Sequence, residues 1–215
     1  MELVDTRDLK SLEGDFVPVQ VRPRVPKKMY YSAEELKKLG FKKIGKNVKV
    51  SSLAKFYSIE QGHLGDNVRI DDFSIFKGRI ILGSNIHISC FCNLSGGYGI
   101  TMEDFTGLSS HTSVFSAVED FISPTLMSPS IDEKYSKIIN GKVLFKEGAK
   151  LGSHCIILPG VTIGKHVVAT AQTLIDRDVE NFAVIGPKQR SFKKFGYRNE
   201  TEINELKNKF IKNNE

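Results

Sequence analysis

The side chains best suited to chemistry in this 215-residue chain are five histidines and three cysteines. A catalytic zinc site needs three ligands, commonly histidines, that converge on one ion. No two histidines in the sequence have the close spacing of such ligands: His63, His87, His111, His154 and His166. The sequence therefore predicts no metal site, and a zinc-dependent hydratase is the weaker alternative that metal analysis would test.

The three cysteines predict buried, reduced thiols rather than a redox or metal motif. Cys90 and Cys92 are two residues apart, which is not the spacing of a CxxC motif, and Cys155 stands alone. The first ten residues are acidic where an export signal needs a basic start, and no apolar run reaches the roughly 18 residues of a membrane span. We therefore expect a cytoplasmic protein without a membrane span.

The net charge of +6 raises the question of nucleic-acid binding. The basic residues are spread along the chain, and the densest run lies at 188–194. The sequence has no helix-turn-helix, RNA-recognition or zinc-finger pattern and no basic stripe rich in aromatic residues. We expect no nucleic-acid partner, because a phosphate-bearing small molecule accounts for the charge equally well.

An apolar residue recurs every six positions through most of the chain. The register slips by two residues after Gly96-Gly97, and three runs share the period: Leu64, Ile70, Phe76, Leu82, Ile88 and Leu94; Met102, Leu108 and Val114; Phe145, Leu151, Ile157, Ile163, Ala169 and Ile175. Such a period fits a coil of three short strands and neither an amphipathic helix nor an alternating strand. Glycine follows the apolar position at Gly65 and Gly83, which suits a corner with a positive φ angle or a close backbone approach.

This pattern predicts an all-β fold, a parallel β-helix whose stacked coils bury the apolar residues. A β-sandwich is the weaker alternative, because its strands recur at a looser spacing. The predicted regions are an N-terminal extension with a short helix at its end, residues 1–40; the β-helix domain, residues 41–186, interrupted by an excursion at 120–142; and a basic tail with a C-terminal helix, residues 187–215. The excursion is expected to be functional, because long irregular loops on rigid scaffolds usually are.

Two stretches of the sequence resemble the hexapeptide-repeat acyltransferases. LGSHCIILPGVTIG at 151–164, followed by IDRDV at 175–179, is similar to the galactoside and maltose O-acetyltransferases and to acetyltransferases of surface-polysaccharide sugars. MYYSAEELKKLGFKKIGKNVKVSSLAKFYS at 29–58, with NVRIDDF at 67–73, resembles the polysaccharide branch, which includes N-acetyltransferases of nucleotide-linked 4-amino-4,6-dideoxy sugars. The resemblance covers roughly residues 29–195. It implies a left-handed β-helix, a homotrimer with active sites between adjacent subunits, and acetyl-CoA as co-substrate.

The resemblance also implies a position for the catalytic base. Relatives carry a histidine in the hexad before the excursion, and this sequence has Glu119 there, followed by Asp120. A hydroxyl acceptor needs a base such as histidine, whereas an amine is already a good nucleophile once deprotonated. The carboxylates therefore favour an amine acceptor, with a sugar hydroxyl as the alternative. His111 is the second candidate for the base.

Coenzyme A lies along the C-terminal coils in relatives, between adjacent subunits. The matching positions here are Ser153 and Ala171, whose small side chains leave room for the pantetheine arm. Arg177 matches a basic residue of the family and is expected to meet the phosphates of coenzyme A. By charge alone, Arg190 and Lys193 are further candidates.

The substrate side is less specified by sequence. Asp71 and Asp72 lie in the RIDDF match and are expected to hydrogen-bond sugar hydroxyls. Together these observations predict transfer of an acetyl group from acetyl-CoA to the amino group of a nucleotide-linked deoxy amino sugar, such as dTDP-4-amino-4,6-dideoxyglucose, in the biosynthesis of a surface polysaccharide (O-antigen). A non-catalytic β-helix scaffold subunit is the alternative of a different class.

Overall fold

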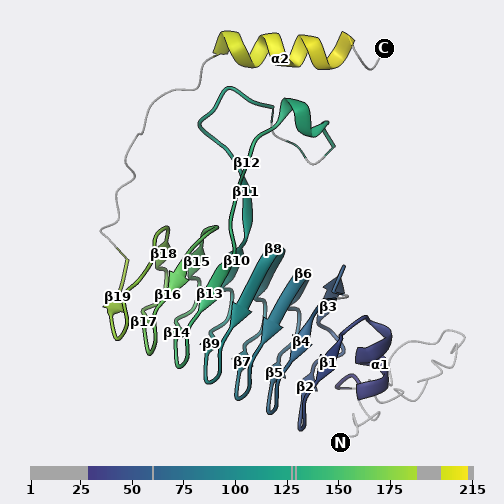
Figure 1. Ribbon diagram of the computed structural model, residues 1–215, viewed down its shortest axis with the longest axis vertical. Coiled ribbons are helices and arrows are strands. Elements are labelled where there is room, and N and C mark those ends of the chain that lie inside the picture. Colours follow the sequence, from purple (N-terminus) through teal and green to yellow (C-terminus); the bar gives the residue numbers. More distant parts are fainter. Residues whose placement is uncertain (1–28, 60, 127, 129, 188–199, 213–215) are drawn as a thin grey trace, which may run out of the picture.

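The computed structural model describes residues 29–59, 61–126, 128, 130–187 and 200–212. Between residues 41 and 187 these residues wind into about seven coils of short parallel strands, which stack into a prism (Figure 1). The predicted left-handed parallel β-helix is thereby confirmed.

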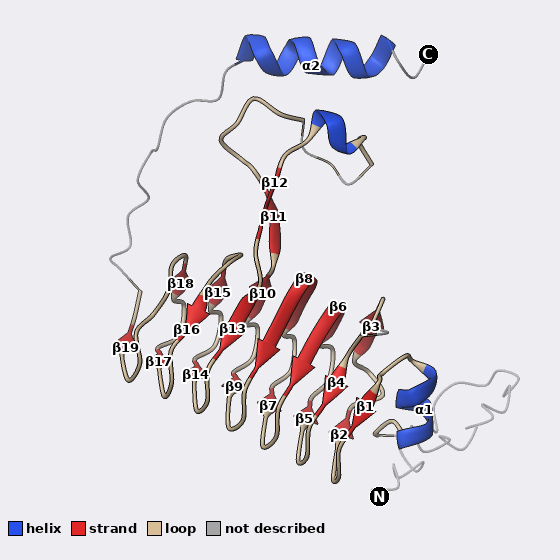
Figure 2. Ribbon diagram, in the orientation of Figure 1, coloured by secondary structure: helices blue, strands red, loops and turns tan. Residues whose placement is uncertain are grey.

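The strands follow one another coil by coil (Figure 2). In chain order they are β1 (Lys43–Ile44), β2 (Lys49–Val50) and β3 (Lys55–Tyr57); β4 (His63–Leu64), β5 (Arg69–Ile70) and the first half of β6 (Ile75–Leu82); the rest of β6, β7 (His87–Ile88) and the first half of β8 (Asn93–Met102); the rest of β8, β9 (Gly107–Leu108) and β10 (Ser113–Phe115); β13 (Val143–Phe145), β14 (Lys150–Leu151) and β15 (Ile156–Ile157); β16 (Thr162–Ile163), β17 (Val168–Ala169) and β18 (Leu174–Ile175); and β19 (Val184–Ile185).

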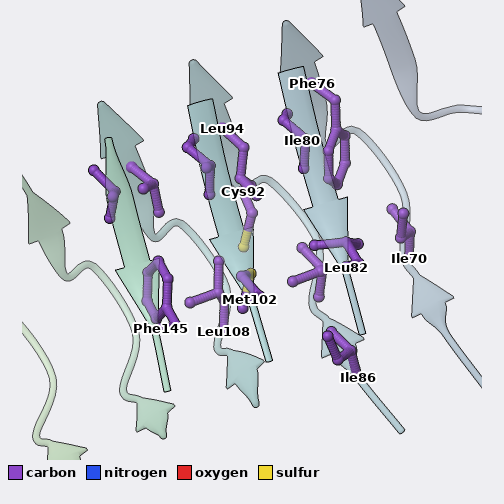
Figure 3. Packing of buried hydrophobic residues seen from close by; sticks show 14 of the residues in the cluster. Ile70, Phe76, Ile80, Leu82, Ile86, Cys92, Leu94, Met102, Leu108 and Phe145 are labelled. Atoms are coloured by element: carbon purple, nitrogen blue, oxygen red, sulfur yellow. The ribbon is translucent and has the colours of Figure 1, made fainter. Parts of the chain in front are cut away.

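The apolar hexad residues form the core because each lies directly above its counterpart in the neighbouring coil. In the seven-stranded sheet, for example, Ile70 pairs with Ile88, Ile88 with Leu108, and Leu151 with Ala169. These side chains are 3% exposed or less and belong to one core cluster. Figure 3 shows part of this cluster inside the prism, with Ile70 and Leu108 among its labelled residues. The hexad residues therefore bury one another only when the coils keep a fixed length.

The two-residue slip predicted at Gly96-Gly97 is a bulge in β8. Gly78 of β6 pairs with Gly96, but Ile80 pairs with Ile100, so β8 holds two more residues than β6 over this stretch. A bulge absorbs extra residues without disturbing the strands on either side. The inward register is therefore restored from Ile100 onwards, and both Ile80 and Ile100 are buried.

The predicted short helix is α1 (Ala33–Lys38), and it packs against the first coil. Ser32 and Glu35 form the expected capping box, in which each side chain accepts a hydrogen bond from the other residue's backbone N–H. Leu36 of α1 is buried in the same core cluster as Phe41. The predicted C-terminal helix is α2 (Glu200–Lys212). Residues 1–28 of the predicted N-terminal extension lie outside the described residues.

Of the two reasons predicted for a glycine after the inward residue, close backbone approach is confirmed and a positive φ angle is not. None of Gly65, Gly83 and Gly152 has a positive φ, and a Cβ at Gly65 would lie 2.3 Å from the carbonyl oxygen of Gly83. The positive angles fall two residues later, as at Asn67 (φ +55°) and Asn85 (φ +59°). These glycines are therefore needed because adjacent coils approach too closely for any side chain.

The excursion leaves the prism after β10 and returns at β13. Its base is a two-stranded antiparallel stalk, β11 (Ala117–Glu119) with β12 (Ile138–Asn140), and its outer part contains the 3-10 turn η2 (Glu133–Tyr135). The stalk stands away from the stacked coils (Figure 1). The predicted excursion is therefore an ordered element that extends beyond the prism.

Coil contact predicts a measurable difference between two glycines. Gly65→Ala places a methyl group against the Gly83 backbone and should lower the stability of the protein by roughly 1–3 kcal/mol. Gly97→Ala should be nearly neutral, because a Cβ there meets nothing within 4 Å. Thermal unfolding of both variants measures the difference. Equal melting temperatures would contradict close coil contact at Gly65.

Candidate active site

The predicted site residues gather mainly at one corner of the prism. This corner follows the seven-stranded sheet β2, β5, β7, β9, β14, β17 and β19. We call the second residue after each inward apolar residue the polar row: Asp72, Cys90, Ser110, Ser153 and Ala171. The third residues after the same apolar residues form a row in which all but the last carry a ring, and we call it the ring row: Phe73, Phe91, His111, His154 and Gln172. The polar row therefore brings one predicted substrate residue and both predicted pantetheine residues onto one edge.

Backbone hydrogen bonds lock the two rows together from coil to coil. The carbonyl of Ser110 accepts from the N–H of His154 at 3.1 Å, and that of Ser153 accepts from the N–H of Gln172 at 2.8 Å. Ser153 is half-buried, whereas Ala171 is exposed. The structure thus confirms that Ala171 lies one coil beyond Ser153, while their contact with a cofactor stays a prediction.

Ser110 is the residue of this corner that the sequence analysis did not single out. Its hydroxyl lies 2.9 Å from the hydroxyl of Ser89 and 3.3 Å from the sulfur of Cys90. It occupies the polar row one coil before Ser153, so it lies between the predicted substrate and cofactor positions. The excursion hides this relation in the sequence, because it inserts residues between two coils that are neighbours in space.

His111 belongs to a stack of rings rather than to an isolated polar position. Its ring lies 4.9 Å from that of Phe91 and 4.6 Å from that of His154, and the three planes are nearly parallel. The backbone of His111 has a φ of +63°, which histidine tolerates better than most residues. Stacking and corner geometry are therefore sufficient to explain a histidine here, and its role as a base stays a prediction.

Asp71 and Asp72 both accept hydrogen bonds from neighbouring side chains. The two carboxylate oxygens of Asp71 lie 2.7 Å from Nε of Arg69 and 2.7 Å from Nε2 of His87. Partial burial raises the pKa of Asp71, but the hydrogen bonds from His87 and Arg69 outweigh it and leave the pKa below the ordinary value. Asp72 accepts a hydrogen bond from the hydroxyl of Ser51. Direct contact of either aspartate with sugar hydroxyls stays a prediction.

Asp120 is a buried carboxylate at the outer end of the stalk, directly after β11. One oxygen accepts from the backbone N–H groups of Ile122 and Ser123, and the other from the Ser123 hydroxyl at 2.6 Å and Nζ of Lys137 at 2.9 Å. These hydrogen bonds, led by those from Ser123 and Lys137, hold the pKa of Asp120 well below its ordinary value. Asp120 is therefore ionised at neutral pH, which makes it a weak base but a strong electrostatic partner for a cation.

Glu119 differs from its neighbour in its surroundings. It ends β11, opposite Ile138 of β12, and its side chain is half-buried. Within the described residues its carboxylate takes part in no side-chain hydrogen bond. The two predicted catalytic acids therefore have distinct environments, one fully bonded and one available to accept a proton or a hydrogen bond.

Of the predicted phosphate contacts, one lies within the described residues. Arg177 is exposed and pairs with Asp176 at 2.8 Å, and the hydrogen bond that it donates to Asp176 raises its already high pKa. It borders a surface pocket of about 360 Å³ at the C-terminal end of the prism, which Leu174, Val179 and Gly186 also line. Arg190 and Lys193 lie outside the described residues.

Two of the three cysteines are poor nucleophiles in their buried environment. Cys92 and Cys155 are buried, Cys90 is half-buried, and all three thiols are free. Burial raises the pKa of Cys92 to about 11 and also raises that of Cys155. These two sulfurs are therefore neutral thiols near pH 7, which are poor nucleophiles. In the described part of the chain, no group of three or more His, Cys, Asp or Glu side chains is placed to hold a metal ion.

Comparisons with known proteins agree with this geometry. The chain is 32% identical over 158 residues to the dTDP-4-amino-4,6-dideoxy-D-glucose acyltransferase of Escherichia coli. The matched region spans 72% of this chain and 82% of that enzyme. It is also similar to AntD, an N-acyltransferase from Bacillus cereus solved with dTDP and 3-hydroxybutyryl-CoA, with 40% identity, a TM-score of 0.72 and coverage of 86% and 97% of the two chains. No family model matches the chain.

A further AntD structure contains dTDP-4-amino-4,6-dideoxyglucose and coenzyme A, and it matches with 38% identity, a TM-score of 0.72 and coverage of 87% and 99%. The β-helix and these similarities define the class: the protein is an acyl-CoA-dependent acyltransferase. It belongs to the hexapeptide-repeat sugar acyltransferase family, together with the Escherichia coli enzyme. Among the described residues, no helix is long and apolar enough to cross a membrane.

The polar row predicts where coenzyme A binds. Ala171→Phe should weaken acyl-CoA binding at least tenfold, about 1.4 kcal/mol, because the new ring fills the space beside Ser153. The fold should survive, because Ala171 is exposed and the buried residue of this strand is Ala169. Calorimetric titration with coenzyme A measures the change.

The matched control places the same ring far from this position. Ile75→Phe enlarges an exposed apolar side chain on the second coil and should bind coenzyme A like the parent protein. Unchanged affinity in Ala171→Phe would mean that coenzyme A does not lie along these coils.

Proposed function

We propose that this protein transfers an acyl group from an acyl-CoA to the 4-amino group of dTDP-4-amino-4,6-dideoxyglucose. The observation that carries the proposal is the similarity to AntD, which was solved with this same nucleotide sugar and coenzyme A and which matches 87% of the chain. The Escherichia coli relative is an acyltransferase of the same sugar. We assign the reaction to the cytoplasm and to the assembly of a surface polysaccharide.

An amine acceptor is consistent with the carboxylates at the outer end of the stalk. The neutral amine attacks the thioester carbonyl, which places a positive charge on nitrogen in the tetrahedral intermediate. An ionised carboxylate stabilises that charge without needing a pKa near neutrality. Asp120 supplies an ionised carboxylate, and Glu119 supplies a carboxylate able to accept the proton that the nitrogen then loses. The carbon–sulfur bond of the intermediate then breaks, and coenzyme A leaves as the thiolate, which takes up a proton.

Ser110 and Asp120 are the residues we place on either side of the amino group. Structures of AntD include variants at one serine and at one aspartate that lie ten residues apart in that enzyme. Ser110 and Asp120 are the only serine and aspartate with that order and spacing in this sequence. Ser110 also lies in the polar row one coil before Ser153, where we place the thioester end of the cofactor.

These two residues favour a homotrimer with shared sites. Within one chain, Ser110 lies at the corner after β9, whereas Asp120 follows β11 at the end of the stalk that is farther from the prism. A neighbouring subunit would bring its excursion to this corner. The excursion also exposes apolar side chains, which is typical of an interaction surface: Phe121, Ile122, Ile138 and Ile139.

The relatives do not identify the acyl group that this protein transfers. The sequence analysis predicts acetyl, whereas AntD was solved with 3-hydroxybutyryl-CoA. Mass spectrometry of reactions with acetyl-CoA or 3-hydroxybutyryl-CoA should show one added acyl group on the nucleotide amino sugar. The matched control is the 4-hydroxy counterpart of the sugar, which should not react. Faster acylation of that hydroxyl sugar would replace the proposal with O-acylation.

The composite site makes a prediction about mixed variants. Ser110→Ala and Asp120→Asn should each lower turnover, with about a 10²-fold loss for Asp120→Asn, and neither should change the oligomeric state. If one site takes Ser110 from one subunit and Asp120 from the next, unfolding and refolding the two variants together restores about one quarter of parent activity.

Light scattering and circular dichroism verify that every sample is folded and trimeric. The control mixture contains Ser110→Ala alone and should gain nothing on refolding. A stable monomer, or an equal mixture of the two variants as inactive as its components, would contradict the shared site. A full loss in Glu119→Gln with normal turnover in Asp120→Asn would transfer the role to Glu119.

A further inference from the structure

The outward face of the seven-stranded sheet carries a column of basic side chains. Register partners on successive coils are Lys49 with Arg69 and Arg69 with His87. Gly107 follows, and Lys150 pairs with it. The four basic side chains are exposed and lie in the strands that end at the polar row. An anionic ligand beside the polar row would therefore face positive charge on one side.

Two of these side chains are held by one carboxylate. Asp71, with a side chain 19% exposed, lies 2.7 Å from both Arg69 and His87 through different oxygens. Arg69 makes this contact through Nε, and a guanidinium has four further N–H donors on its terminal nitrogens. The arrangement fixes a planar donor group and an imidazole on adjacent coils, which suits recognition of phosphate oxygens.

The cluster lies at a defined distance from the position of the amino group. His87 is one coil before Gly107, whose coil contains Ser110, and Arg69 is two coils before it. Coils are about 5 Å apart, so His87 and Arg69 lie about 5 and 10 Å along the prism from Ser110. Ser153 and Ala171 lie one and two coils away in the opposite direction. Donor and acceptor positions therefore extend in opposite directions from Ser110.

This order matches the covalent order of the proposed substrate. In a nucleotide sugar the diphosphate joins carbon 1, on the opposite side of the ring from the amino group on carbon 4. With the amino group beside Ser110 and the thioester toward Ser153, the diphosphate extends toward the coils of His87 and Arg69. We propose that the Arg69–Asp71–His87 cluster is the diphosphate subsite for the nucleotide sugar.

The inference rests on the proposed function and assigns separate roles within it. Arg69 and His87 contact the phosphate oxygens, and Asp71 is a positioning residue that orients both of them. Asp71 therefore acts on the substrate through Arg69 and His87 and not through sugar hydroxyls. The subsite accounts for affinity toward the nucleotide and leaves the chemical step to residues nearer Ser110.

Titration with dTDP alone tests the subsite. Arg69→Gln should weaken dTDP binding roughly tenfold or more, the scale of a charge-assisted contact, and His87→Gln should weaken it less. Arg79→Gln is the matched control, because Arg79 is an exposed arginine of β6 outside the seven-stranded sheet. It should bind dTDP like the parent protein. Coenzyme A binding should be the same in all of these proteins.

Kinetics separate positioning from general structural damage. Arg69→Gln and Asp71→Asn should raise KM for the nucleotide amino sugar and leave kcat within about threefold, because uniform binding is lost. The free amino sugar without its nucleotide should react equally well with Arg69→Gln and parent protein. Equal dTDP affinity in Arg69→Gln, His87→Gln and parent, or an equal loss in Arg79→Gln, would overturn the subsite. Failure of the parent protein to bind dTDP would instead overturn the proposed nucleotide substrate.

Discussion

The structure depends on the vertical stacking of one inward apolar residue per hexad. Each such residue buries the residue above it, so every coil must keep its length and its register with the next. Close backbone approach enforces the same constraint from outside the core, as the contact of Gly65 with Gly83 shows. Extra residues are accommodated only where they leave the ladder, either as the bulge beside Gly97 or as the excursion. Both interruptions leave the inward columns continuous.

This constraint converts sequence spacing into rows of functional groups. The same corner recurs on every coil. Ser110, Ser153 and Ala171 therefore align along one edge, and the Arg69–Asp71–His87 cluster lies beside that edge. The acyl-CoA and the nucleotide sugar can then lie end to end along the prism, with their reacting atoms at the same coil. The excursion adds a further carboxylate outside these rows, that of Asp120, which accepts hydrogen bonds from Ser123 and Lys137. The prism therefore provides the aligned rows, and the excursion provides an additional charged group.

Most of the fold was accessible from the sequence, because the hexad pattern and the Ser32–Glu35 capping box are local signals with one structural solution. The stacking of Ser153 on Ala171 followed from the same arithmetic. Ser110 was missed because the excursion separates it from Ser153 in sequence but not in space. The bonding of Asp120 and the clustering around Asp71 depend on side-chain directions that the hexad pattern does not specify. The glycines after the inward residues were anticipated, and of the two causes considered the structure shows close contact between coils rather than a positive φ angle.

The central claim is that donor and acceptor meet at the coil of Ser110. A crystal structure of the protein with coenzyme A and dTDP-4-amino-4,6-dideoxyglucose tests it most directly. The account predicts the pantetheine arm beside Ser153 and Ala171, the sugar amino group within hydrogen-bonding distance of Ser110, and the diphosphate on Arg69 and His87. Coenzyme A bound away from the polar row, or a sugar amino group remote from Ser110, would contradict it.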